Sequence, residues 1–315
     1  MTAFVRQFGE DRDPLVAAER SGMTIRKAVI PAAGLGGLLY PITKVQPKEM
    51  LPLGRKPAVH LVVEELVGAG LTDLCIVTSR GRRAIEDHFN FAAGAGAPGA
   101  DRDTFPAALV ENRARVSFVE QPEPKGMGEA LLRAREFVGD EPFVVALGDA
   151  VITGSESPGG LVQRMEHTMA ATGGDAVIAV RNVARAHVSQ YGVLTPIGDP
   201  VGKAHFMIAD IVEKPPIEEA PSTIAVAGRY ILQPLIFDYL EETPPGLGGE
   251  LQLTDALRRM VHDRESVWAE FMRPGERRFD LGNFLQYSRA FIHFSLNDPE
   301  VGLSVKEYLQ QLIGG

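Results

Sequence analysis

The sequence has almost no cysteine, no long apolar run and no excess of positive charge. Its single cysteine, Cys75, excludes an internal disulfide and a cysteine-rich zinc site, and the surrounding apolar run LCIVTS predicts an inert buried thiol. No apolar stretch approaches the roughly 20 residues that cross a bilayer. The N-terminal segment MTAFVRQFGEDRDPLVAAER is charged and lacks the apolar core of a signal peptide. We therefore expect a cytoplasmic protein with no membrane partner.

The charge balance is acidic, with 41 Asp and Glu against 32 Lys and Arg, and a formal net charge of −9 over 315 residues. Proteins that bind nucleic acid broadly draw most of their affinity from Lys and Arg, so we expect no nucleic-acid partner. A small anionic ligand stays compatible, because a local pocket can be positive on an acidic protein. The histidines form no H-E-x-x-H motif and no G-x-S-x-G elbow is present, which argues against a histidine metal site and a serine hydrolase.

From Ile25 onward, short apolar runs alternate with amphipathic stretches. Strands are predicted at 27–32, 73–79, 115–121, 142–149 and 175–183, and helices at 57–70, 81–90, 126–138 and 159–172. This alternation predicts an α/β fold with a Rossmann-like, mainly parallel mixed sheet and helices on both faces. Beyond Arg185 the chain is richer in strands (191–196, 204–215 and 223–232), and helices at 251–264, 283–296 and 304–313 follow. We expect residues 1–24 to form an N-terminal extension and residues 25–315 a single domain that includes the C-terminal helices.

The stretch VIPAAGLGGLLYPITK, residues 29–44, is an apolar strand that runs into a glycine cluster. Glycines permit positive φ and close backbone approach, so the N–H groups around Gly34 could surround phosphate oxygens. The spacing matches neither G-x-G-x-x-G nor the Walker A pattern. From this loop alone, phosphate binding and a plain tight turn are equally supported.

Charged residues near predicted strand ends add candidates. In QPKEMLP, two prolines hold Lys48 and Glu49 in an extended segment, where Lys48 is either a phosphate contact or a solvated surface residue. Asp149 and Asp280 follow predicted strands. Two carboxylates together with substrate phosphates can hold Mg²⁺, although each aspartate alone fits a turn equally well. The spacing does not show whether the two converge.

A fourth candidate is DIVEKPP, which places Glu213 and Lys214 at the end of an apolar strand stopped by proline. Neighbouring residues of an extended chain face opposite sides, so these two side chains would diverge unless the chain turns there. A surface position and a functional pair are both compatible with this pattern.

Taken together, these stretches resemble the bacterial UTP–glucose-1-phosphate uridylyltransferases, within the sugar-nucleotide pyrophosphorylase superfamily. The resemblance spans about residues 25–306 and rests on KAVIPAAGLG, PITK, PKEMLPL, KPAVHLVVEELVGAG, EQPEPKGMGEAL, YGV, VEKP, VAGRYIL, ELQLTDAL and DLGNFLQY. It implies a nucleotidyltransferase fold of the GT-A-like type and a homodimer or homotetramer. It also implies a reaction in which glucose 1-phosphate attacks the α-phosphorus of UTP with Mg²⁺, forming UDP-glucose and pyrophosphate.

The resemblance assigns roles to residues that match the family motifs. Nucleotide contacts would come from Ala32, Ala33, Gly34, Glu49, Gln121 and Gly126, sugar contacts from Gly192, Glu213 and Lys214, and the Mg²⁺ ligands would be Asp149 and Asp280. Lys48, Lys214 and Asp149 would be the catalytic residues, with Lys48 on the nucleotide phosphates and Lys214 on the sugar phosphate.

One segment departs from the family pattern G-x-G-T-R-x-x-P-x-T-K, because Gly37 and Leu38 stand where the pattern has Thr and Arg. That arginine is expected to hold the leaving pyrophosphate, and losing such a donor commonly costs about 10² to 10³ in rate. Three interpretations stay open. The chain is a uridylyltransferase that is slowed, or compensated by Lys44, Arg55 or another cation; it is a nucleotidyltransferase for another sugar phosphate or base; or it is a non-catalytic paralogue that binds nucleotide-sugar or regulates an active enzyme.

Overall fold

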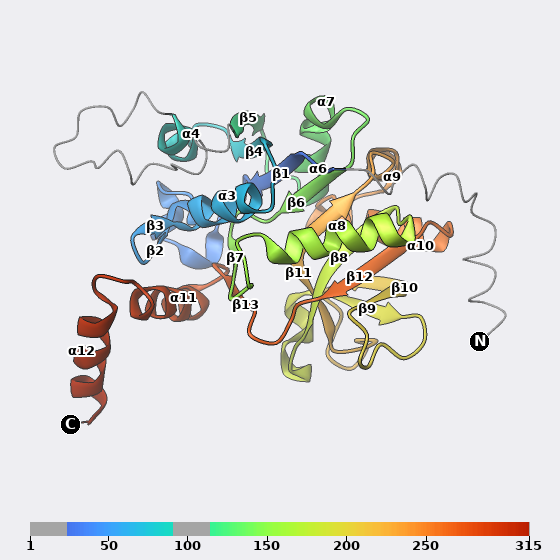
Figure 1. The fold of residues 1–315 in the computed structure, drawn as a ribbon. Helices are drawn as coiled ribbons and strands as arrows, with labels where there is room; N and C mark the ends of the chain where they lie inside the picture. Colours follow the sequence, from blue (N-terminus) through green and yellow to red (C-terminus); the bar gives the residue numbers. More distant parts are fainter. Residues whose placement is uncertain (1–23, 91–113, 315) are drawn as a thin grey trace.

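The computed structural model describes residues 24–90 and 114–314, so the predicted N-terminal extension lies almost wholly outside the described residues. A nine-stranded mixed sheet crosses the molecule in the order β5-β4-β1-β6-β11-β8-β12-β10-β9 (Figure 1). These strands are β1 (Lys27–Ala32), β4 (Asp73–Ser79), β5 (Arg115–Gln121), β6 (Phe143–Ala146), β8 (Ala176–Asn182), β9 (Gly192–Pro196), β10 (His205–Glu213), β11 (Ile224–Leu232) and β12 (Val267–Phe271). The first four in the order are parallel, whereas β11 is antiparallel to both β6 and β8.

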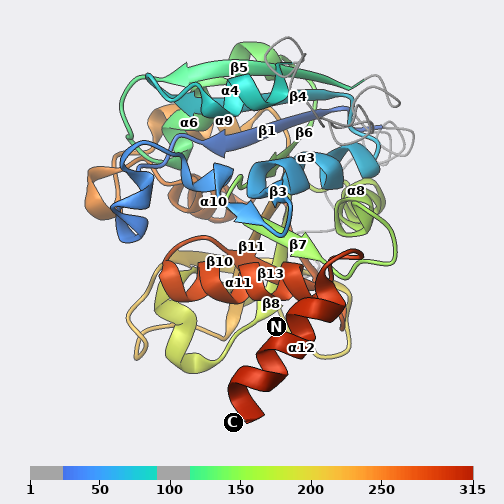
Figure 2. The ribbon, with the colours of Figure 1, turned by 90° about the vertical axis from the view of Figure 1, so that its left-hand side faces the viewer.

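Helices cover both faces of this sheet, as the alternating sequence pattern predicts (Figures 1 and 2). They are α3 (Ala58–Gly68), α4 (Ala84–Phe89), α6 (Met127–Arg133), α7 (Arg135–Val138), α8 (Gly160–Thr172), α9 (Ile236–Glu242), α10 (Leu253–His262), α11 (Phe284–Leu296) and α12 (Gly302–Gly314). In β1, Ile30 belongs to the buried cluster that includes α3 and α8 side chains, while its neighbour Val29 belongs to the cluster that includes those of α6, α9 and α10. A central strand buried on both faces explains why β1 is an unbroken apolar run.

Short elements depart from the predicted pattern. The helix expected over 126–138 is two helices, because Ala134 between them leaves helical geometry (φ −92°, ψ 2°). Strand β7 (Ala150–Thr153), which the sequence did not predict, pairs antiparallel with β13 (Arg277–Asp280), which ends at Asp280 as expected. In this pair Asp280 lies opposite Ala150. A further small hairpin joins β2 (Pro52–Leu53) and β3 (Lys56–Pro57). The β7–β13 pair is what brings distant parts of the chain to the candidate site.

A buried ion pair anchors β7 to the rest of the fold. Arg229 of β11 is fully buried and donates to both carboxylate oxygens of Glu65 on α3, at 3.0 and 2.7 Å. It also donates to the carbonyl oxygen of Ala150 at 2.8 Å. Because a buried charge is costly unless it is paired, Arg229 ties α3, β7 and β11 together.

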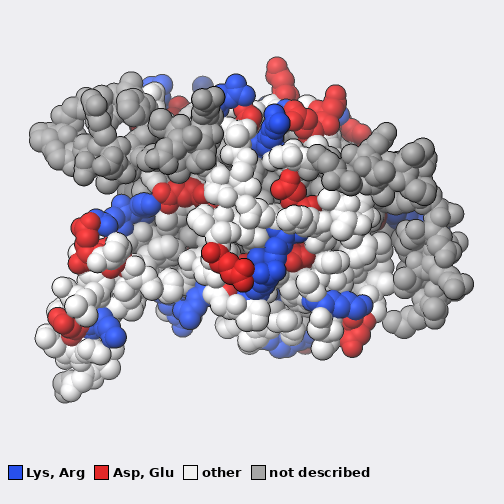
Figure 3. Space-filling view, viewed as in Figure 1, with Lys and Arg blue, Asp and Glu red and all other residues white. Residues whose placement is uncertain are grey.

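The C-terminal helix α12 projects from the body of the molecule and lies next to α11 (Figures 1 and 2). It exposes large apolar side chains, among them Leu303, Leu312 and Ile313. On the face shown in Figure 3, acidic and basic side chains are interspersed. Of the helices in the described ranges, none has both the length and the apolar character required to span a membrane.

Candidate active site

A cavity of about 460 Å³, the first cavity, brings together five of the residues predicted from the sequence: Asp149, Gly192, Glu213, Lys214 and Asp280. Leu38 of the glycine loop also lines it. The other lining residues are Met127, Leu147, Ser189, Gln190, Tyr191, Val226, Gly228, Tyr230, Gln252, Thr254, Arg278, Gly282, Asn283 and Gln286. Segments far apart in the sequence therefore meet around one space.

The two aspartates converge through the β7–β13 pair. Asp149 directly precedes β7, Asp280 ends β13, and the backbone N–H of Leu281 donates to the Asp149 carbonyl at 3.0 Å. Each carboxylate has a cationic neighbour: Lys48 pairs with Asp149, and Arg278 pairs with Asp280. The convergence that sequence spacing left open is thus present in the structure.

Burial and these cations act against each other on the two carboxyls. Burial of Asp149 opposes its ionisation, but the ammonium of Lys48 outweighs it and lowers the Asp149 pKa. Burial raises the pKa of Asp280 in spite of Arg278. Across residues 24–90 and 114–314, no group of three or more His, Cys, Asp or Glu side chains is arranged to hold a metal ion. Mg²⁺ bound by two carboxylates together with substrate phosphates does not require such a group.

The glycine loop follows β1 and turns tightly. Gly36 has φ 68°, and a Cβ there would lie 2.8 Å from Cγ2 of Thr43, so only glycine fits without a shift. The Thr43 hydroxyl donates to the Gly36 carbonyl at 2.8 Å and closes the turn. Lys48 Nζ lies 3.6 Å from the position that a Cβ of Gly34 would occupy. The loop is thus held close to one half-buried cation, Lys48, while Leu38 is 74% exposed.

Lys44 and Arg55 were the named candidates to serve this loop in place of the arginine. Lys44 is exposed, and Arg55 instead pairs with Asp298 and Glu300 at 2.8 and 2.7 Å, next to α12. The cation that does contact the loop is Arg82, which donates to the carbonyls of Gly34 and Thr43 at 3.4 and 3.2 Å. Sequence reasoning missed Arg82; the basic run RGRR directly after β4 was the available signal.

Glu49 is predicted to contact nucleotide, yet its side chain is enclosed, with the residue only 1% exposed. Within the described part of the chain its Oε2 atom has no hydrogen-bond partner. Burial raises the pKa of this carboxyl to about 8, although Lys48 next to it acts in the opposite direction. A direct nucleotide contact by Glu49 therefore requires the surrounding segment to move.

Gln121 and Gly126, predicted to hold the base, are neighbours in the structure. Gln121 ends β5, and its amide donates to the Gly126 carbonyl at 3.0 Å and to Glu129 Oε2 at 2.6 Å. Gly126 has φ 98°, and a Cβ there would lie 2.6 Å from the carbonyl oxygen of Leu251. The next residue, Met127, lines the first cavity, so this pair borders it through the start of α6.

Of the residues predicted to contact the sugar, Gly192 lies opposite Glu213 in the β9–β10 pair. The Thr254 hydroxyl donates to Glu213 Oε2 at 2.8 Å, which fixes the carboxylate in the cavity wall. Lys214 adopts φ +43°, and its backbone N–H donates to the Tyr191 carbonyl at 3.0 Å. This turn brings Lys214 Nζ within 3.6 Å of Glu213 Oε1, so the two adjacent side chains do not diverge.

Several lining residues were not singled out from the sequence. Tyr191, Arg278 and Asn283 adjoin recognised motif residues, and this adjacency was a usable signal. Tyr230 belongs to the buried strand β11, where its sequence pattern predicts core packing and nothing more.

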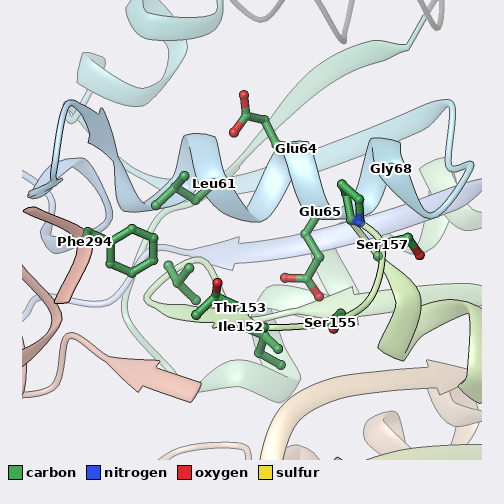
Figure 4. A pocket seen from close by; sticks show the side chains of 13 residues that line it. Leu61, Glu64, Glu65, Gly68, Ile152, Thr153, Ser155, Ser157 and Phe294 are labelled. Carbon is green, nitrogen blue, oxygen red and sulfur yellow. The ribbon is translucent and has the colours of Figure 1, made fainter. Parts of the chain in front are cut away.

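A separate cavity of about 490 Å³, the α3 cavity, lies between α3, β7 and α11 (Figure 4). In Figure 4, Glu65 points from α3 toward the β7 segment that carries Ile152 and Thr153, and Phe294 lies at the other end. None of the residues predicted for the site lines this cavity. Since Glu65 is bound to Arg229, we assign this carboxylate a structural role.

Comparison with known proteins decides the family. A family model described as nucleotidyl transferase matches residues 27–295. The UTP–glucose-1-phosphate uridylyltransferase of Bacillus subtilis (strain 168) is 37% identical over 300 residues, covering 92% of this chain and 97% of the relative. This chain belongs to the UTP–glucose-1-phosphate uridylyltransferase family. Its expected enzyme class, nucleotidyltransferase, is thereby confirmed.

Solved structures agree with membership of the uridylyltransferase family. A UDP-glucose pyrophosphorylase complexed with UDP-glucose superposes with a TM-score of 0.76 at 35% identity, covering 87% of this chain and all (100%) of that one. The UTP-bound enzyme from Acinetobacter baumannii gives 0.77 at 32% identity, with coverage of 92% and 100%. The nucleotidyltransferase fold is therefore confirmed, while the roles of individual residues stay predictions.

Proposed function

We propose that this uridylyltransferase family member forms UDP-glucose and pyrophosphate from UTP and glucose 1-phosphate. The observation that carries the proposal is the first cavity, where Asp149, Asp280, Glu213 and Lys214 line one space. Proteins of the same fold were solved with UTP and with UDP-glucose, which supports a uridine nucleotide as the ligand. We also infer that residues 25–315 act as one domain, because a single sheet holds strands from 27 to 271.

In this proposal, positioning and charge supply most of the catalysis. A phosphate oxygen of the sugar phosphate attacks the α-phosphorus of UTP, and the bond to the pyrophosphate leaving group breaks. Lys48, next to Gly34, would neutralise nucleotide phosphates that lie on the loop. Lys214 would hold the sugar phosphate, and Glu213 with Gly192 would receive the sugar hydroxyls.

The paired carboxylates fit a hard divalent ion. Mg²⁺ prefers oxygen ligands and often uses one or two carboxylates together with substrate phosphates. Asp149 and Asp280 offer such oxygens in the first cavity. A bound Mg²⁺ would supply positive charge to the phosphate oxygens during transfer. Both aspartates already have cationic neighbours, so each can exchange one positive partner for another.

The test is pyrophosphate release with UTP, glucose 1-phosphate and Mg²⁺, using Asp149→Asn and Asp280→Asn. Each change removes one ligand charge, and we expect at least a ~10²-fold loss of kcat/KM, comparable to losing a preorganised charged contact. Asp87→Asn, on the exposed side of α4, is the matched control and should stay within about twofold. Unchanged turnover in the two site variants would reject their metal role.

A non-catalytic, nucleotide-sugar-binding paralogue is the second candidate, and Leu38 is the observation that favours it. In that case wild-type protein shows no turnover above background, whereas calorimetry still detects UDP-glucose binding. A third outcome, turnover only with another sugar 1-phosphate or another nucleotide, would keep the reaction class and change the substrate. The cytoplasmic location expected from the sequence stays a prediction.

We further propose a homodimer or homotetramer in which the α11–α12 face packs on a second copy of the chain. Phe284 and Leu285 of α11 and Leu303 and Leu312 of α12 are exposed, and a projecting apolar helix gains stability by burying such side chains. Light scattering should report a dimer or larger for the wild type and a smaller species for Leu303→Lys/Leu312→Lys. A wild-type monomer at micromolar concentration would contradict the proposal.

A further inference from the structure

A third cavity, of about 320 Å³, adjoins the first one and is rich in cationic side chains. We name it the arginine cavity; Arg181, His187 and Arg289 line it but not the first cavity. The two share a wall made by Gln190, Tyr191, Arg278, Asp280, Asn283 and Gln286. Because Gly192 and Glu213 lie on the far side of this wall, the arginine cavity borders the predicted sugar end of the site.

Two guanidinium groups lie near the same aromatic ring at this wall. The Cζ atoms of Arg181 and Arg278 are 5.3 and 5.4 Å from the ring centroid of Tyr191. Arg181 donates to the Tyr191 hydroxyl at 3.2 Å, and Arg278 donates to the Ala227 carbonyl at 2.8 Å. The Arg278 side chain is only 5% exposed. Two like charges held near one ring repel each other unless negative charge balances both.

A single carboxylate faces both guanidinium groups. Asp280 is the one carboxylate among the residues that line the arginine cavity, and it pairs with Arg278. Within the described ranges no carboxylate lies within ion-pair distance of Arg181, and its Nε atom is buried without a hydrogen-bond partner. A buried donor that makes no hydrogen bond costs free energy, because it has lost its bonds to water. A planar guanidinium presents a fork of donors that matches a carboxylate or a phosphate.

We propose that Arg181, together with Arg278, binds a second oxyanion carried by the sugar substrate, that is, a carboxylate or phosphate group on a sugar 1-phosphate. The proposal rests on the proposed uridylyl transfer and narrows its substrate class to acidic sugar 1-phosphates. Lys214, proposed for the 1-phosphate, lines the first cavity and not the arginine cavity, so the oxyanion in the arginine cavity would be a separate group of the same molecule. Arg289 adds positive charge to the cavity that receives it.

The kinetic test compares glucuronic acid 1-phosphate with glucose 1-phosphate, each with UTP. For wild type we expect a KM for the acidic sugar no higher than that for glucose 1-phosphate. Arg181→Met should lower the ratio of kcat/KM values, acidic over neutral, by at least about tenfold, as expected for loss of a charged hydrogen bond. Arg181→Lys should lower this ratio less than Arg181→Met does, because the ammonium keeps the charge but lacks the planar pair of donors that a guanidinium offers. Arg185→Met, an exposed arginine nearby, should leave the ratio within about twofold.

Binding gives a readout that does not depend on turnover. Measured by calorimetry, Arg181→Met should weaken the binding of UDP-glucuronic acid at least about tenfold more than the binding of UDP-glucose. If turnover is absent but this difference is seen, the proposed reaction fails and the oxyanion site stands. If neither the kinetic ratio nor the binding difference changes, the oxyanion site is overturned. Arg181-dependent binding of free inorganic phosphate without sugar discrimination would also overturn the proposal, by assigning the site to a separate anion.

Discussion

The glycine loop allows a direct test of whether the site lacks a cation. Leu38→Arg places a guanidinium on a side chain that is 74% exposed and lines the first cavity together with Asp149. No core contact is lost, so the free energy of unfolding should change by less than about 0.5 kcal/mol. The companion change Gly37→Thr also fits, because nothing lies within 4 Å of a Cβ built there.

The expected gain follows from the strength of a charged hydrogen bond. A guanidinium that donates to phosphate oxygens contributes about 1.5–3 kcal/mol. Since about 1.4 kcal/mol corresponds to a factor of ten, Leu38→Arg should raise kcat/KM for UTP by about 10 to 10²-fold. Kcat should rise along with it if the new charge stabilises the leaving pyrophosphate more than bound UTP.

Val45→Arg is the matched control for this gain. Val45 is 82% exposed, follows the same loop, and does not line the first cavity. The Val45→Arg change adds the same net charge to the same region as Leu38→Arg. It should change kcat/KM by less than about twofold at 0.15 M salt, where distant charges are screened. Equal gains in both variants would show a general charge effect. No gain in Leu38→Arg would show that Arg82, already on the loop, supplies the charge that we take to be missing.

Three further predictions concern buried charges and the sugar phosphate. Burial raises the Glu49 pKa from 4.5 to about 8, so between these pH values the folded state keeps a proton that the unfolded state loses, and the stability of the wild type falls as pH rises. The Tm advantage of Glu49→Gln over wild type should therefore grow from about pH 5 to pH 8. A Tm difference that stays constant over this range would contradict a raised pKa for the buried Glu49 carboxyl. Arg229→Met should lower the free energy of unfolding in urea by about 3–5 kcal/mol by leaving Glu65 buried and unpaired, and adding Glu65→Met should recover much of it. Lys214→Met should raise the KM for the sugar phosphate at least about tenfold and that for UTP much less; equal effects would place Lys214 on the nucleotide instead.

The central strands were predictable because their burial leaves a simple mark in the sequence. The strands predicted at 27–32 and 73–79 have the bounds of β1 and β4, since parallel strands covered on both faces appear as short apolar runs between turn residues. Strand β7 was missed because it has only four residues, and for β13 the sequence indicated only the end at Asp280, because RRFD carries no apolar pattern. The break at Ala134 was missed because alanine favours helix, and local propensity gives no sign of a kink there.

For the site, the sequence indicated positions but not geometry. Motif matches named Asp149 and Asp280, yet their approach depends on the register of β7 against β13, which neither motif encodes. The same holds for Lys214: the motif named it, and only its φ of +43° shows that the amine turns back toward Glu213. Arg181 had no motif at all, and its significance depends on a neighbour, Tyr191, that directly precedes a different strand, β9.

The glycine loop shows why comparing positions in one segment gives an incomplete account of charge. Between Ala33 and Thr43 the chain carries no Lys or Arg, and the expected arginine is replaced by Leu38. A phosphate responds to the field at its location, to which any nearby segment can contribute. In the fold, Lys48 approaches Gly34 from one segment and Arg82 binds the Gly34 carbonyl from another. A loop whose own sequence has no cation can therefore still lie next to cations from other segments. The comparison of Leu38→Arg with Val45→Arg measures how much kcat/KM gains from a further cation at position 38.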